Sequence, residues 1–297
     1  MAIVSYWSYG KKETGQTLSM AATMISMGAD HNFKILGVST EYQDNTLEEA
    51  FFDVQKEKAF QEMMAKEQQK IARATGGVMG GAPMRTNSAM NSGIEGLLKL
   101  VQSNRITPEA IKDYAKAILN NRLDILQSPS AKSYNDYVEI CKNYRKIIQT
   151  ANRDYNMIFV DVDKSLPEEI QRELLEISDL VVVNITQNQK GVQGFLELRT
   201  KDELFQKNNV IPLIGRYDKY SRYNKKNITR EFRQKRDVCT IAYNTLFYEM
   251  ATDGMLVDYY LRYRDTKESF DRNKVFVDEA RKTCETIIFK LQELQMR

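Results

Sequence analysis

The sequence predicts an α/β fold, a mostly parallel twisted sheet with helices on both faces. Three observations lead to this prediction. Short apolar runs alternate with helical patterns along nearly all of the 297 residues, which is typical of parallel strands joined by helices. A polar loop bounded by glycines joins the first apolar run to the first helix. Asp161 ends another apolar run, at the edge of the sheet where such folds bind ligands.

The chain opens with an apolar strand over residues 2–7, a polar loop and a helix over residues 18–28. The helix places apolar or small residues at Leu18, Ala21, Ala22, Ile25 and Gly28, the spacing of a face that lies on a sheet. From Gly10 to Thr17 the loop keeps the frame G-x-x-x-x-G-K-[ST], with Gln16 at the lysine position. Loops of this kind hold phosphate with backbone N–H groups. An ordinary strand–turn–helix with two glycines is the alternative.

The other elements follow in alternation. Strands are expected over residues 33–39, 122–126, 157–162, 179–185, 210–214 and 238–241. Helices are expected over residues 46–73, 94–102, 108–121, 132–152, 167–176, 192–205, 228–234, 254–263 and 274–295. No linker rich in Pro or Gly divides the chain, so we expect one domain over residues 1–297, with a helical and glycine-rich excursion at about 53–121. Its loop, Gly76 to Gly93, is interpreted as structural or regulatory.

The amino-acid composition limits the classes of function that are expected. Lys and Arg total 43 against 40 Asp and Glu, a net charge of +3, too balanced to indicate nucleic-acid binding by itself. Cys141, Cys239 and Cys284 lack metal or redox spacing, and His31 is the only histidine. We find no signal peptide and no apolar run long enough to cross a bilayer, so we expect a cytoplasmic protein without a transmembrane segment.

Acidic residues follow two of the predicted strands. Asp161 stands at the position where phosphate-loop proteins carry the acid of the Mg²⁺ shell. Glu41 and Asp44 come just after the second strand. If the strands are neighbours, these acids and the Thr17 hydroxyl form a Mg²⁺–triphosphate site. For Glu41 and Asp44, a solvated loop carboxylate is an equal alternative.

Five segments together resemble one family. VSYWSYGKKETGQTLSMAA resembles the deviant phosphate loop, K-G-G-x-G-K-[ST], of the ParA/MinD-type ATPases, the SIMIBI branch of phosphate-loop proteins. YNMIFVDVD resembles their second acidic strand, and SDLVVVNITQN the strand after it. VIPLIGRYDKYSRYNKKNITREF is similar to their base-binding strand and helix, and TIAYNTLFYEMATDGMLVDYYLRY to their closing segment. The resemblance spans most of the chain and is looser over residues 52–121.

The resemblance implies ATP and Mg²⁺ as cofactors and assigns roles to residues. Lys11 matches the signature lysine that reaches the partner's phosphates in a nucleotide-sandwich dimer. Thr17 and Asp161 match Mg²⁺ ligands, and Glu41 stands where an aspartate positions water. The implied catalytic set is Lys11, Glu41 and Asp161, and the metal set is Thr17, Glu41 and Asp161. The implied nucleotide-binding residues are Gly10, Lys11, Lys12, Glu13, Thr14, Gly15, Gln16, Thr17 and Leu18, with Arg216 and Tyr217 near the adenine.

The loop departs from the family pattern at two places. Gln16 replaces the lysine, and Lys12-Glu13 replaces the paired glycines. A charge-assisted lysine–phosphate hydrogen bond is worth about 1.5–3 kcal/mol, so its loss lowers affinity by roughly one to two decades. Lys11 or Lys12 would compensate in part. We therefore expect ATP binding with weak or no hydrolysis.

The function implied is an ATP-dependent homodimer that positions a cellular assembly. The degraded loop favours the TadZ/CpaE-like branch, which positions a pilus or secretion apparatus and is recruited to a pole or membrane-associated complex. One alternative is a plasmid or mobile-element partition ATPase that binds nonspecific DNA and a partner protein. A second is an interaction scaffold that binds no nucleotide; measuring ATP binding separates it from the others.

Two surface segments carry further alternatives. Residues Arg216 to Arg236 interleave cations with Tyr217, Tyr220 and Tyr223, a composition that can bind a nucleic-acid backbone. A solvated loop and helix beside the nucleotide base is the preferred interpretation. The C-terminal helix has one apolar face and a polar face of mixed charge, so packing on the sheet is expected rather than direct membrane binding.

Overall fold

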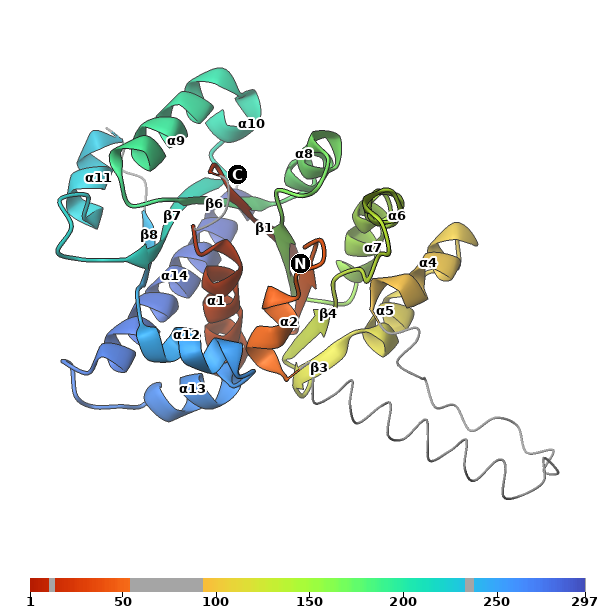
Figure 1. The fold of residues 1–297 in the computed structure, drawn as a ribbon, viewed down its shortest axis with the longest axis horizontal. Helices are drawn as coiled ribbons and strands as arrows, with labels where there is room; N and C mark the ends of the chain where they lie inside the picture. Colours follow the sequence, from red (N-terminus) through yellow and green to blue (C-terminus); the bar gives the residue numbers. More distant parts are fainter. Residues whose placement is uncertain (11–13, 54–92, 233–237, 297) are drawn as a thin grey trace.

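The computed structural model describes residues 1–10, 14–53, 93–232 and 238–296. These residues form an α/β fold around an eight-stranded sheet of order β3-β4-β2-β5-β1-β6-β7-β8 (Figure 1). The strands are β1 (Ala2–Ser8), β2 (Ile35–Ser39), β3 (Lys116–Leu119), β4 (Leu123–Leu126), β5 (Met157–Val162), β6 (Leu180–Ile185), β7 (Val210–Tyr217) and β8 (Cys239–Ala242). Only the β3–β4 pair of this sheet is antiparallel. The predicted fold class is confirmed.

The helices alternate with these strands. They are α1 (Gln16–Asp30), α2 (Thr46–Phe51), α4 (Ile94–Gln102), α5 (Pro108–Tyr114), α6 (Tyr134–Cys141), α7 (Tyr144–Ala151), α8 (Glu168–Glu176), α9 (Gln189–Lys201), α10 (Glu203–Gln206), α11 (Lys225–Glu231), α12 (Thr245–Thr252), α13 (Leu256–Tyr263) and α14 (Arg272–Gln295). Buried side chains of α1, α2 and α12–α14 pack in one core. Those of α4–α11 pack in a second core on the other face.

Strand β1 lies in the middle of the sheet, and this placement determines where the loops meet. Tyr6 is paired with Asp161 on β5, and Ser8 with Asn184 on β6. All seven residues of β1 are buried, as expected for a central parallel strand. The loops that follow β1, β5 and β2 therefore leave the same edge of the sheet. That edge carries the loop between Gly10 and Thr17.

The predicted helix over residues 108–121 is wrong in its second half. Helix α5 ends at Tyr114, and β3 pairs antiparallel with β4 through a tight turn. Asn121 in this turn has φ 58°, a left-handed conformation that asparagine tolerates better than most residues. The Asn120–Asn121 pair is therefore a turn signal that the helical interpretation passed over.

Other boundaries also differ. The predicted helix over 132–152 is divided into α6 and α7. Helix α12 was not predicted, although Asn244 caps it by accepting a hydrogen bond from Phe247 N at 2.9 Å. The predicted helix over 46–73 is described only as far as α2, and the loop at 76–93 lies outside the described residues except for Gly93.

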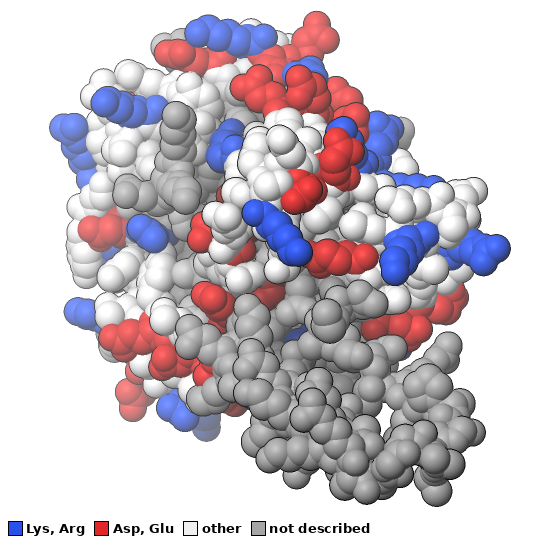
Figure 2. Space-filling view, turned by 45° about the vertical axis from the view of Figure 1, so that its right-hand side comes forward, with Lys and Arg blue, Asp and Glu red and all other residues white. Residues whose placement is uncertain are grey.

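Helix α14 packs against α1 and β8, and Figure 1 shows α1 and α14 on the same face of the sheet. Its buried residues include Phe276, Ala280 and Ile287. Arg281 donates to Asp30 at 2.6 Å, which ties α14 to the end of α1. Within the described residues, no helix has the length and apolar character needed to span a membrane. On the face shown in Figure 2, Lys and Arg are interspersed with Asp and Glu.

Candidate functional site

The second half of the glycine-bounded loop is fixed between two strands. Thr14 Oγ1 lies 2.5 Å from Ser8 Oγ at the end of β1. On β7, a Cβ at Gly215 would lie 2.3 Å from the Thr14 carbonyl oxygen, so only glycine lets the loop approach this closely. Gly15 has φ 71°, the left-handed conformation, and α1 begins at the next residue. Lys11, Lys12 and Glu13 lie outside the described residues, while Gly10 directly precedes them.

Helix α1 begins without a cap. Its N-cap residue, Gly15, has no side chain to accept a hydrogen bond, and no side-chain cap from the described residues is found. The first N–H groups of a helix have no partner within the helix. The N–H groups of Gln16, Thr17 and Leu18 belong to this turn, and Ser19 N is the first that donates to the loop, to Gly15 O at 2.9 Å. Uncapped N–H groups and the helix dipole favour an anion at this position.

The side chain of Gln16 is turned toward the sheet. Its Nε2 donates to Asp161 Oδ1 at 2.5 Å and to the carbonyl oxygens of Tyr6 and Val162, each at 3.1 Å. Two amide hydrogens thus serve three acceptors on β1 and β5. Gln16 therefore stabilises the junction of α1 with the sheet, and it brings no positive charge to the loop.

The structure brings together the three residues of the predicted metal set. Thr17 Oγ1 donates to Glu41 Oε1 at 3.5 Å, a long contact, and Thr46 N donates to Glu41 Oε2 at 2.9 Å. Glu41 and Asp161 are 6% and 1% exposed, so neither is a solvated loop carboxylate. Asp161 Oδ2 is buried and has no hydrogen-bond partner among the described residues.

Burial of these acids shifts both of their pKa values upward. Desolvation, and next the charge of Asp161, raise the pKa of Glu41 to about 8. Desolvation raises the pKa of Asp161 to about 6, although the nearby Thr17 hydroxyl and the hydrogen bond from Gln16 lower it. Two neighbouring carboxylates in a desolvated site favour a bound cation.

Mg²⁺ fits this donor set. The ion is commonly held by one or two carboxylates and completes its shell with water and phosphate oxygens. The unpartnered Asp161 oxygen and the Thr17 hydroxyl offer such ligands. In the described part of the chain, no group of three or more His, Cys, Asp or Glu forms a metal centre by itself. An ion here would therefore depend on water or a ligand for its other contacts.

Two tyrosines that were not predicted connect the acidic loops. Tyr137 of α6 donates to Thr40 O at 2.6 Å, next to Glu41, and its hydroxyl lies 3.1 Å from Ser165 Oγ. Tyr134 donates to Ser165 O at 2.8 Å. The spacing of the two tyrosines, three residues apart on one helix face, is the sequence signal that was available.

Arg216 and Tyr217 point in opposite directions from β7. Arg216 has φ 53° and is exposed; its Cγ would lie 3.4 Å from a Cβ on Gly15, and its Nε donates to Tyr248 Oη at 2.9 Å. Tyr217 is 9% exposed and packs in the core under α9 and α11, and its hydroxyl accepts from Lys225 N at 3.0 Å. Only Arg216 lies beside the loop.

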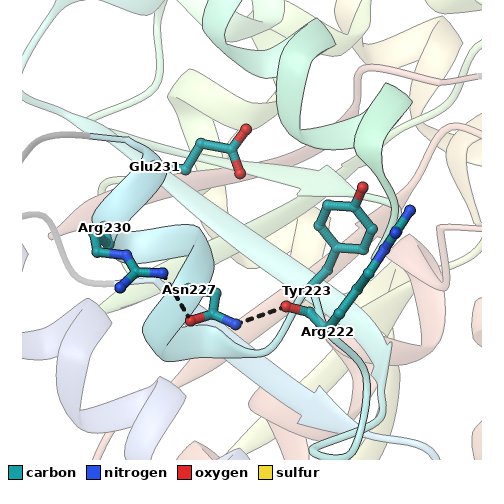
Figure 3. Close-up of a pocket in the computed structure, with 5 residues that line it drawn as sticks. All are labelled: Arg222, Tyr223, Asn227, Arg230 and Glu231. Carbon is teal, nitrogen blue, oxygen red and sulfur yellow. Dashed lines mark hydrogen bonds between the residues drawn. The ribbon is translucent and has the colours of Figure 1, made fainter.

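A separate hollow of about 460 Å³ lies on α11 and the turn before it. Figure 3 shows its lining residues, Arg222, Tyr223, Asn227, Arg230 and Glu231. Asn227 connects the two arginines, donating to Arg222 O at 2.8 Å and accepting from Arg230 Nη2 at 3.4 Å. The hollow is open and its lining is of mixed polarity, and none of its lining residues belongs to the loop around Gly15.

A central β1, a glycine-bounded loop and an acid on the neighbouring strand define the phosphate-loop NTPase type of α/β fold. Solved structures of similar fold include a ParA family ATPase from Chlorobium tepidum TLS, with a TM-score of 0.63, 13% identity and 98% of each chain covered. Another is the septum site-determining protein MinD from Pyrococcus horikoshii OT3 complexed with Mg-ADP, with a TM-score of 0.61, 13% identity, and 97% of this chain and 98% of that chain covered.

A third is a protein from Borrelia burgdorferi B31 assigned as a plasmid partition protein and bound to AMPPNP, with a TM-score of 0.53, 15% identity and 98% of each chain covered. At these identities the similarity establishes the fold, which is that of ParA and MinD ATPases. No protein-family model matches the sequence, and neither does the sequence of any curated protein.

Proposed function

We propose that this protein is a ParA/MinD-like protein of the SIMIBI type that binds ATP with Mg²⁺. The observation that carries the proposal is the grouping of Thr17, Glu41 and the unpartnered oxygen of Asp161 at the uncapped start of α1. Two of the proteins with a similar fold were solved with Mg-ADP and with AMPPNP. A buried acid pair and an uncapped helix start suit a cation and an anion bound together.

Each residue has a definite part in this proposal. When bound, ATP would supply the triphosphate, and Mg²⁺ would supply the positive charge that balances the buried acids. The N–H groups of Gln16, Thr17 and Leu18 receive the phosphate, and the side chains of Thr17 and Asp161 hold the ion. Glu41, anchored by Thr46 N, orients a water molecule. Arg216 borders the nucleotide beside Gly15, and Lys11 to Glu13 complete the loop, as the sequence predicts.

Weak or absent hydrolysis is part of the same proposal. Phosphoryl transfer depends on positive charge placed near the transferred group. The Gln16 amide is neutral, and its N–H groups are already engaged by Asp161, Tyr6 and Val162. We therefore expect nucleotide binding to serve as a positional signal that closes a homodimer rather than to sustain rapid turnover.

The assembly that such a dimer positions is proposed from the degraded loop. ParA/MinD-like proteins with eroded catalytic residues resemble the TadZ/CpaE branch, which acts at a pilus or secretion apparatus. We therefore propose that the protein acts in the cytoplasm, where a partner protein recruits it to a pole or a membrane-associated complex.

Nonspecific DNA binding, as in a partition ATPase, is the second candidate. The observation in its favour is a set of cations in the described part of the chain that form no ion pair with any described carboxylate, namely Arg216, Lys219, Arg222, Lys225, Lys226 and Arg230. The double substitution Arg222→Gln, Arg230→Gln should weaken duplex binding at least tenfold. It should also make the slope of log affinity against log salt concentration shallower by about one for each phosphate no longer neutralised. Unchanged affinity would remove this candidate.

ATP titration tests the main proposal. Binding is measured by calorimetry and association by sedimentation, each with Mg²⁺, for the wild type and Gln16→Lys. The substitution should tighten binding by about tenfold or more and should produce turnover. Gln149→Lys, which adds the same charge to the exposed face of α7, is the matched control.

Three results would contradict the proposal in different ways. No ATP binding by either protein at millimolar concentration favours a scaffold that uses no nucleotide. Binding without association removes the dimer but leaves the site. An identical gain in the Gln149→Lys control would mean that added charge, and not its position, explains the effect.

A further inference from the structure

Lys164 lies in the turn between β5 and α8, three residues after Asp161. Its Nζ is 3.5 Å from the centre of the Trp7 ring. Trp7 is the penultimate residue of β1 and is paired with Val162 on β5. The turn that carries Lys164 and the loop that leads to α1 therefore leave neighbouring strands at the same edge of the sheet.

The ammonium group of Lys164 has no carboxylate partner among the described residues. The carboxylate nearest in sequence, Asp163, accepts instead from Ser165 N at 2.7 Å and from Ser165 Oγ at 2.5 Å. Burial lowers the pKa of Lys164 to about 8, while the charges of Glu168 and Asp163 oppose this shift. Lys164 is thus a partly desolvated cation. Among the described residues, its ammonium group is in close contact with the face of the Trp7 ring.

An ammonium group in this environment would gain free energy by moving from the aromatic ring to a nearby phosphate. A cation–π contact is weaker than a charge-assisted hydrogen bond to phosphate. Desolvation increases the attraction to a nearby anion, because the charge is screened less than in water. The Lys164 side chain is flexible, so its Nζ can leave the Trp7 ring without a change in the backbone.

The position of Lys164 relative to the acids indicates which phosphate it would meet. Asp161 is on β5, the strand that precedes the turn with Lys164, and it lies beside Gln16 and Thr17 at the start of α1. In phosphate-loop proteins the acid at this place holds the shell of a Mg²⁺ ion that bridges the last two phosphates. Because the turn that carries Lys164 begins directly after β5, the strand of this acid, a bound terminal phosphate would be the nearest of the phosphates to Lys164.

We propose that Lys164 supplies, to the terminal phosphate of a bound nucleoside triphosphate, the positive charge that Gln16 lacks. The inference rests on the proposed function and adds selectivity for triphosphate over diphosphate. Arg216 is another cation near the described part of the loop, but it is on β7, which β6 separates from β1, and its Nε donates to Tyr248. Lys164 directly follows the strand that carries Asp161.

The test compares Mg-ATP and Mg-ADP affinity, measured by calorimetry, for the wild type, Lys164→Met and Lys164→Arg. Lys164→Met keeps the length of the side chain over Trp7 and removes its charge, so ATP affinity should fall about 10- to 100-fold and ADP affinity less than threefold. Lys164→Arg should retain most of the ATP affinity. Lys190→Met, an exposed lysine at the start of α9, should change neither affinity.

Trp7 provides a readout that does not depend on turnover, since it is the only tryptophan in the chain. Withdrawal of Lys164 from the indole should alter wild-type emission with Mg-ATP and leave it unaltered with Mg-ADP. Lys164→Met should show no ATP-specific change. If this variant fails to fold, as judged by urea unfolding, Lys164→Gln replaces it as the neutral variant.

Several results would overturn the inference. Wild-type ATP affinity in the neutral variants would overturn it while leaving the proposed function intact. Equal losses of ATP and ADP affinity would remove the assignment to the terminal phosphate. Failure of the wild type to bind either nucleotide would remove both the inference and the proposed function.

Discussion

Two charged regions of the molecule are built in opposite ways. At the start of α1, Glu41 and Asp161 are buried, have raised pKa values, and meet only neutral donors among the described residues. On α11 and the turn before it, Arg222 and Arg230 are surface cations around an open hollow. The net charge of +3 conceals this separation.

The difference shows how each region depends on ligands. Buried acids destabilise the ligand-free fold, because desolvation penalises their charged forms. A protein keeps such buried acids when a bound ligand balances their charge. Exposed cations are hydrated and affect stability little. The first region is therefore expected to bind a specific, compact ligand, and the second at most an extended polyanion, with strong dependence on salt.

The largest expected effect is loss of Mg²⁺-dependent ATP binding in Asp161→Asn. The substitution removes the carboxylate charge and keeps the shape, so we expect at least a 100-fold loss of Mg-ATP affinity by calorimetry. Asp154→Asn, which alters a partly exposed acid paired with Lys34, is the control and should bind normally. Normal binding by Asp161→Asn would show that the acid has no part in ligand binding.

Gln16→Ala should destabilise the ligand-free protein by about 1–3 kcal/mol. The change leaves Asp161 Oδ1 and the carbonyl oxygens of Tyr6 and Val162 without their shared donor. The free energy of unfolding in urea measures this loss. Gln149→Ala on the exposed face of α7 should lie within about 0.5 kcal/mol of the wild type. An equal effect of the two substitutions would refute a structural role for Gln16.

A buried acid on α2 gives a pH test. Burial raises the pKa of Glu48 above its usual value of 4.5. The carboxyl therefore contributes stability that is fully present below pH 4.5 and is lost as pH rises through the higher folded pKa. As pH rises above 4.5, the free energy of unfolding of the wild type, measured in urea at a series of pH values, should therefore fall relative to that of Glu48→Gln. The exposed neighbour Glu49, changed to Gln, should leave the pH profile as it is in the wild type.

The smallest effect is expected on the exposed side. Arg222→Gln with Arg230→Gln should change the free energy of unfolding by less than about 0.5 kcal/mol, because neither guanidinium pairs with a described carboxylate. Urea unfolding of this double variant and Gln16→Ala side by side measures the contrast directly. A large loss in the double variant would mean that the hollow is a structural element.

The sequence predicted the buried central strands of the sheet better than its edge strand. Strand β5 matches its prediction residue for residue, because a short run whose residues are apolar except for Asp161 has few other interpretations. The edge strand β3 was missed because it is short, only partly buried and follows a helical pattern. The single domain over residues 1–297 stays a prediction.

In the site, spacing predicted which residues gather, but not how they are oriented. The frame from Gly10 to Thr17 predicted a loop before α1, and the acids at Glu41 and Asp161 are found beside Thr17. That the Gln16 amide turns onto Asp161 depends on a side-chain conformation chosen by contacts with β1 and β5. The burial of Tyr217 in the same core as Ile214 depends on an irregularity of β7 between these residues, where Arg216 has φ 53°, and a regular two-residue strand period does not predict it.

The neutral contact between Gln16 and Asp161 has a consequence for how the site opens. Freeing the carboxylate breaks an amide hydrogen bond and separates no opposite charges. Dissolved salt acts on separated charges and changes such a step little. A lysine in the same place would form an ion pair whose release varies with ionic strength. In this protein the amide of Gln16 is uncharged, so its contact with Asp161 should break equally readily in dilute and in concentrated electrolyte.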